Sequence, residues 1–105
     1  MEIQGNCDHK FTEVKELFES LHSSGREVGS SFAVYKDGKA IVDIWGGYTD
    51  KRKTNPWNQN SLANVWSTTK GVAALTCALA VEKGLLDYEQ KVSHYWPEFG
   101  CNGKE

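Results

Sequence analysis

The sequence has 105 residues, of which 39% are hydrophobic and 25% charged, and its formal net charge is −2. This composition excludes a disordered chain, and the length allows one small domain at most. We find no basic patch for nucleic acid, and the longest apolar run, about ten residues, is too short for a membrane span.

The N-terminal segment is polar, so we expect residues 1–8 to be frayed. It lacks the basic and apolar regions of a secretory signal. The three cysteines are odd in number, and Cys77 lies within an apolar run. We therefore expect reduced thiols and a cytoplasmic protein.

Two local patterns predict the first elements of the fold. Apolar residues at steps of three and four predict an amphipathic helix over residues 10–22. Residues 31–35 and 39–45 are rich in β-formers and are joined through Asp37-Gly38, a strong signal for a tight hairpin turn.

A third pattern, over residues 72–81, is apolar at nearly every position. A helix that is apolar on all sides belongs in the middle of a domain, so we expect it to be buried and to end at Gly84. Trp57 and Trp66 precede it. These two side chains either line a cleft beside Ser67 or pack in the interior.

Ser67 stands where the polar chain gives way to the apolar run, and it is expected to cap the helix with its hydroxyl. Three residues later a capping box has Glu or Gln, but here the residue is Lys70. A cation in the first turn is disfavoured by roughly 0.3 to 1 kcal/mol. Such a local violation often marks a functional site.

The same physics predicts a catalytic pair. Burial and the helix N-terminus both disfavour a charged ammonium, so a neutral Lys70 amine is expected part of the time. Ser67 lies one turn away on the same helical face, where that amine can take its proton. No metal or cofactor is expected, since His9, His22 and His94 are far apart in the sequence.

The order of these segments resembles one family. It is similar to the N-terminal part of the serine β-lactamase-related proteins, which include class C β-lactamases, penicillin-binding-protein-like peptidases and esterases of the same fold. The resemblance runs from about Phe11 to Lys104. Its most specific stretches are Ser67-Thr68-Thr69-Lys70-Gly71, Gly84-Leu85-Leu86-Asp87 and Tyr95-Trp96-Pro97-Glu98-Phe99.

The resemblance implies an α+β fold, the N-terminal part of a β-lactamase/transpeptidase-like domain, with an amphipathic helix, a β-hairpin and a buried nucleophile-bearing helix. It also implies that Ser67 is acylated by a small-molecule ester or amide, that Lys70 acts as base, and that water releases the acyl group. The backbone N–H of Ser67 would form half of the oxyanion hole. Neither nucleic acid nor membrane is an expected partner.

The sequence departs from the family pattern in two motifs. None of its four tyrosines is followed two residues later by Asn, so the Tyr-x-Asn motif is missing. Lys53-Thr54-Asn55 lacks the glycine of a Lys-Thr-Gly strand and precedes Ser67. We therefore expect residues 1–105 to be an N-terminal fragment, with the remainder of the domain C-terminal to it.

Two other interpretations stay open. The first is a truncated isoform or degenerate relative in which Ser67 only caps the helix. The second is a small binding module that uses Trp57 and Trp66. Ligand affinity unchanged by Lys70→Ala would favour the binding module.

A two-stranded hairpin is marginally stable alone. We therefore expect the 105 residues by themselves to be weakly stable and nearly inactive. Thermal melting and hydrolysis of p-nitrophenyl esters measure this, and a midpoint above about 60 °C with rapid hydrolysis would contradict it.

Overall fold

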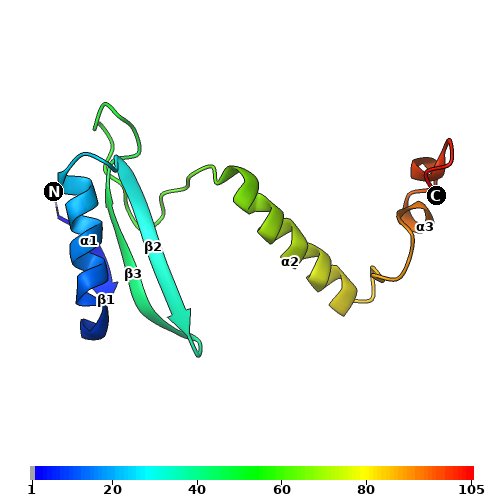
Figure 1. Ribbon diagram of the computed structural model, residues 1–105, viewed down its shortest axis with the longest axis horizontal. Helices are drawn as coiled ribbons and strands as arrows, with labels where there is room; N and C mark the ends of the chain where they lie inside the picture. The colour runs from blue at the N-terminus through cyan, green and yellow to red at the C-terminus, as the bar shows by residue number, and fades with distance from the viewer. Residues whose placement is uncertain (1) are drawn as a thin grey trace. The chain divides into compact units, whose positions relative to one another are not determined.

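The computed structural model describes residues 2–105. They form two compact units that divide between Ala63 and Asn64. The first unit holds a three-stranded sheet with one main helix, and the second holds the long apolar helix and the aromatic segment (Figure 1). These elements confirm the α+β class. None of the helices in the described residues has the length and apolar character needed to cross a bilayer.

The sheet is antiparallel with strand order β1-β3-β2. Strand β1 (Gln4–Cys7) pairs with β3 (Lys39–Gly47), and β3 pairs on its other edge with β2 (Gly29–Lys36). The prediction that residues 1–8 are frayed is wrong for β1, because the backbone of this segment satisfies the open edge of β3. Met1 lies outside the described residues.

Helix α1 (Thr12–Ser23), preceded by the short 3₁₀ turn η1 (His9–Phe11), confirms the amphipathic helix. It lies along the sheet (Figure 1). Val42 and Ile44 are two residues apart in β3 and therefore point to the same face of the strand. Both are buried with Ile3. Phe18 of α1 packs against this cluster, which is the core of the first unit.

The hairpin turn adopts the geometry that its sequence predicts. Asp37 and Gly38 both have positive φ, at 51° and 74°, and Lys36 lies opposite Lys39. Positive φ at both central residues defines a type I′ turn, whose twist matches that of the flanking strands. The predicted hairpin is confirmed. Each strand is two residues longer at its outer end, and β2 is one residue longer at the turn.

In the second unit, the 3₁₀ turn η2 (Trp66–Thr68) leads into α2 (Thr69–Glu82). The helix ends as predicted at Gly84, whose φ is 68°. The Gly84 N–H donates to the Val81 carbonyl and the Leu85 N–H to the Ala80 carbonyl, each at 2.9 Å. This pair of bonds is a Schellman motif.

The aromatic segment after α2 forms two short helices, α3 (Val92–Tyr95) and η3 (Pro97–Gly100). The Tyr95 hydroxyl accepts a hydrogen bond from the Asp87 N–H at 2.8 Å. The rings of Trp96 and Phe99 lie 5.7 Å apart, and both side chains remain exposed. The segment therefore makes its ring contacts within itself.

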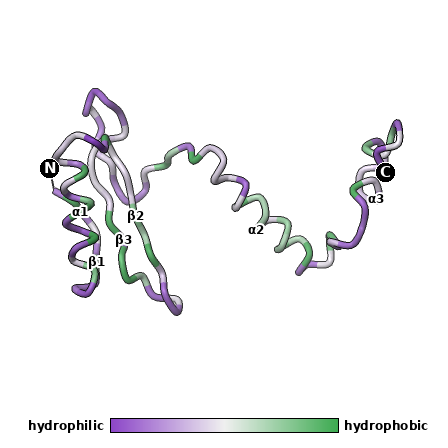
Figure 2. Tube along the Cα trace, in the orientation of Figure 1, coloured by the Kyte–Doolittle hydropathy of each residue, from purple (hydrophilic) through white to green (hydrophobic). Residues whose placement is uncertain are grey.

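The apolar side chains of α2 differ from expectation in their burial. Val72, Leu75 and Leu79 are 57%, 71% and 49% exposed, so the hydrophobic stretch in Figure 2 faces solvent within this unit. The main neighbour of α2 in the second unit is η2, which only leads into it. The predicted burial therefore requires cover that residues 64–105 do not supply by themselves.

His22, near the end of α1, is 6% exposed. Its Nε2 lies 2.9 Å from the Ser30 hydroxyl of β2, which ties helix to sheet, and its Nδ1 has no hydrogen-bond partner among the described residues. Burial lowers the pKa of His22, and the Glu27 carboxylate opposes this by raising it.

Gly38→Ala should lower the free energy of unfolding of the first unit by about 1 kcal/mol, because an L side chain disfavours the left-handed backbone. A Cβ at Gly38 would meet no atom within 4 Å, so the cost is conformational. Asp37→Asn is the control and should leave stability unchanged, since Asn suits the same turn. Urea unfolding measures both, and equal losses would contradict the assignment.

The stability of the first unit should fall on acidification. Because the pKa of His22 is lower in the folded state, the unfolded chain binds the proton more readily. The contribution of His22 is complete above about pH 6.5 and is lost as the pH falls from there through the lowered pKa. Melting temperatures across this range measure it.

Two variants test the assignment to His22. His22→Gln should flatten the acid dependence, and Glu27→Gln should extend it to lower pH because the opposing carboxylate is gone. An acid dependence identical in the native chain and His22→Gln would refute it.

Candidate active site

The structure brings Ser67 and Lys70 together. Ser67 lies in η2, and Lys70 is the second residue of α2. The Lys70 ammonium Nζ donates a hydrogen bond to the Ser67 hydroxyl Oγ at 3.2 Å. Residues three apart in a helix are neighbours on its surface, and the turn that runs from η2 into α2 keeps this spacing.

The prediction that Ser67 caps the helix is wrong. The cap position of α2 is Thr68, which has helical backbone angles and makes no side-chain capping bond. The 3₁₀ turn precedes the α-helix directly, so the chain is already helical at Ser67 and its hydroxyl is turned to Lys70. The hydroxyl therefore accepts a bond from Lys70 and makes no capping bond. Both side chains are exposed, so the expected burial of the Lys70 amine is not found in the described residues.

The first turn of α2 contains no acidic side chain. Among the described residues Lys70 forms no salt bridge, and Ser67 is its hydrogen-bond partner. The positive end of the helix dipole therefore acts on the amine without a compensating carboxylate. The same dipole favours negative charge that develops on the Ser67 oxygen.

The backbone N–H of Ser67 donates to no acceptor among the described residues, whereas the N–H of Thr68 donates to the Val65 carbonyl at 3.1 Å. Free N–H groups are expected in the first turn of a helix. This one belongs to the same residue as the hydroxyl, so it can donate to an oxygen of a group that is bonded to Ser67.

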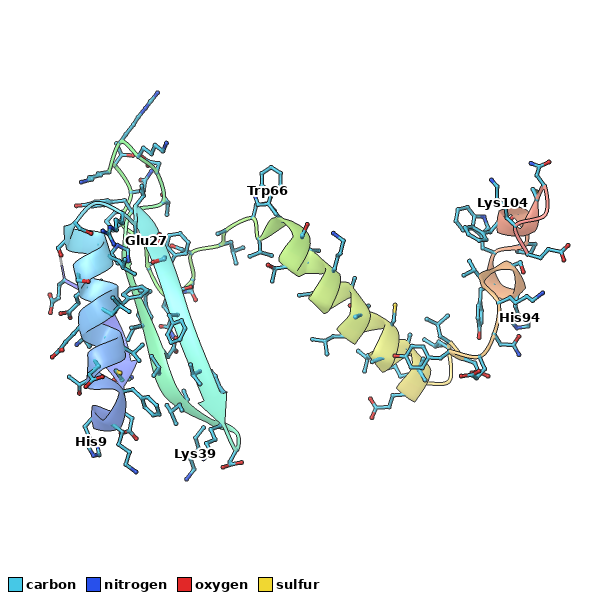
Figure 3. All side chains as sticks on the ribbon, in the orientation of Figure 1. His9, Glu27, Lys39, Trp66, His94 and Lys104 are labelled. Carbon is cyan, nitrogen blue, oxygen red and sulfur yellow. The ribbon has the colours of Figure 1, made fainter. Side chains whose placement is uncertain are left out.

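Trp66 has a backbone conformation that the sequence did not predict. Its φ is 49°, in the left-handed region, and its side chain is 82% exposed. The indole projects from the start of α2 (Figure 3), so it is not packed in its own unit. Sequence reasoning missed the backbone conformation because positive φ is signalled by Gly or Asn and seldom occurs at Trp. Trp57 belongs to the first unit and is half-buried there.

A cavity of about 360 Å³ lies in the first unit and is lined by His22, Ser23, Glu27, Val28, Tyr48 and Lys53. Neither Ser67 nor Lys70 belongs to it. No group of three His, Cys, Asp or Glu side chains among the described residues could hold a metal ion. The candidate site itself presents a hydroxyl, an amine and a backbone N–H.

Comparison with protein families gives one assignment. Residues 14–105 match the family described as Beta-lactamase. The chain is 41% identical over 102 residues to the esterase/beta-lactamase LipL of Mycobacterium tuberculosis, a match that covers 97% of this chain and 24% of that protein.

Solved structures with a similar fold and sequence are named as the same kinds of protein. A family VIII carboxylesterase superposes with a TM-score of 0.90 at 43% identity, covering 99% of this chain and 28% of that one. A penicillin-binding protein homologue from Caulobacter crescentus superposes with a TM-score of 0.89 at 40% identity and the same coverage. The chain thus spans about a quarter of the length of these relatives.

Proposed function

Because the chain belongs to the Beta-lactamase family, whose pattern covers residues 14–105, we propose that it carries the nucleophile of a serine hydrolase of the β-lactamase and esterase type. The observation that carries this proposal is the 3.2 Å hydrogen bond between the Lys70 amine and the Ser67 hydroxyl. The relatives named esterase and carboxylesterase favour an ester substrate, and the penicillin-binding relative extends the class to amides.

The reaction begins when Ser67 Oγ attacks the carbonyl carbon of the substrate. The hydroxyl proton passes to a neutral Lys70 Nζ, which already lies within hydrogen-bond distance. The carbonyl oxygen becomes an oxyanion, and the free Ser67 N–H donates to it. When the tetrahedral intermediate collapses, the leaving group departs with the proton from Lys70. The product is an acyl ester on Ser67.

Water then completes the cycle. It attacks the acyl carbonyl, and its proton moves by way of the Lys70 amine to Ser67 Oγ as the ester bond breaks. The acid is released and the free hydroxyl is restored. Each proton transfer uses the same two side chains.

The proposal includes a role for the apolar helix. Val72, Leu75 and Leu79 are exposed in their unit, although an apolar helix of this kind is stable when it is covered. We assign the cover to further parts of the domain C-terminal to residue 105, since the relatives are about four times as long. The same cover would enclose the Ser67–Lys70 pair at the start of the helix.

Those further parts would also complete the site. The tyrosine of a Tyr-x-Asn motif and the donor of a Lys-Thr-Gly or His-x-Gly strand are absent from these 105 residues. The resemblance places both motifs later in the sequence than the serine. Residues 1–105 thus hold the nucleophile, one base and one oxyanion donor of the proposed hydrolase.

A fluorophosphonate probe tests the nucleophile in the polypeptide that carries this chain with the rest of the proposed domain. Ser67 should be labelled, and Ser67→Ala should abolish the label. Ser61→Ala is the matched control, because the Ser61 hydroxyl accepts a bond from the Asn58 N–H and serves a local turn. Label that persists in Ser67→Ala, or is absent from the native protein, would refute the proposal.

The role of Lys70 as base is tested by the rate at which the same probe labels Ser67. Lys70→Met keeps the length of the side chain and removes the amine, so labelling should slow by about 10²- to 10⁴-fold. Lys83→Met, at the other end of α2, is the control and should leave the rate unchanged. Equal rates in the two variants would remove Lys70 from the mechanism.

A further inference from the structure

The backbone reverses its twist at the residue before the proposed nucleophile. Trp66 has a φ of 49°, while Val65 before it and Thr68 two residues after it have φ of −95° and −59°. In the second unit the other residues with positive φ are Gly84, Gly103 and Asn102. Gly and Asn tolerate the left-handed region, whereas a bulky aromatic residue does so at an energetic cost.

Two hydrogen bonds donated by backbone N–H groups, one at Trp66 and one at Thr68, hold this conformation. The Trp66 N–H donates to the Asn64 side-chain oxygen Oδ1 at 3.2 Å. The Thr68 N–H donates to the Val65 carbonyl at 3.1 Å, closing a turn around Trp66 and Ser67. The indole is 82% exposed, so burial of the ring does not hold the backbone in place.

The reversal determines where the Ser67 groups point. A residue that relaxes from positive to negative φ rotates the peptide that follows it. Here that peptide carries the Ser67 N–H, which donates to no acceptor in the described residues. It also leads to the Ser67 hydroxyl, whose oxygen lies 3.2 Å from the Lys70 Nζ. A rotation would move both groups relative to the Lys70 amine.

We propose that the left-handed backbone at Trp66 positions the nucleophile, so that Trp66 is a positioning residue for acylation of Ser67. The inference rests on the proposed function and adds to it a residue that does not touch the reacting atoms. Strained backbone of this kind persists where surrounding bonds determine it, and such strain concentrates at functional sites. The role belongs to the backbone of Trp66 and not to its ring.

Two substitutions separate backbone from ring. Trp66→Asn and Trp66→Val both remove the indole and are similar in size, but Asn tolerates the left-handed region and a β-branched residue does not. In the polypeptide that carries the whole proposed domain, the fluorophosphonate labelling rate should be preserved within about threefold in Trp66→Asn and fall about tenfold in Trp66→Val. The rate is measured per folded molecule, with melting temperature recorded for each variant.

Ester hydrolysis supplies a second readout. Trp66→Val should lower kcat and leave KM nearly unchanged, because the backbone acts on the nucleophile and not on the bound substrate. Trp66→Gly should restore kcat toward that of Trp66→Asn. A fold-stabilising role alone would change melting temperature without this split.

The outcomes are distinct. Preserved labelling in Trp66→Asn with loss in Trp66→Val supports the inference. Equal losses in both variants overturn it in favour of contact between the indole and substrate, and equal retention overturns it because φ would then not matter. A native protein without label at Ser67 overturns the proposed function, and the positioning role falls with it.

Discussion

The hydrogen bond between Lys70 and Ser67 depends on how the helix begins. A 3₁₀ turn joins α2 without a break, so the chain is helical at Ser67 and the two residues lie one turn apart. Had Ser67 been the cap, its hydroxyl would have accepted a backbone N–H and left the amine without a partner. The start of the helix therefore decides whether the serine is structural or available for chemistry.

Elements that local chemistry determines were predictable from the sequence. Asp37-Gly38 specifies a type I′ turn because both residues tolerate positive φ, and the turn then fixes the register of β2 and β3. Gly84 ends α2 for the same conformational reason. The Ser67–Lys70 pair was found because a cation occupies a position where helices favour an acid.

Features that depend on distant partners could not be read from the sequence. The segment Gln4–Cys7 looks like a polar tail, and it becomes a strand only because β3 offers it an unpaired edge. The positive φ of Trp66 was missed for a different reason. The acceptors that hold it, Asn64 and Val65, are close in the sequence, but a Trp carries no signal for the left-handed region.

The apolar sides of α2 and the hydrogen-bonded Ser67–Lys70 pair at its start are both exposed. Val72, Leu75 and Leu79 are exposed within the second unit, so α2 presents apolar surface that its own unit leaves uncovered. Any partner that covers the helix removes this apolar surface from water and so stabilises it. The stability of the apolar helix therefore depends on contacts that residues 64–105 do not make among themselves.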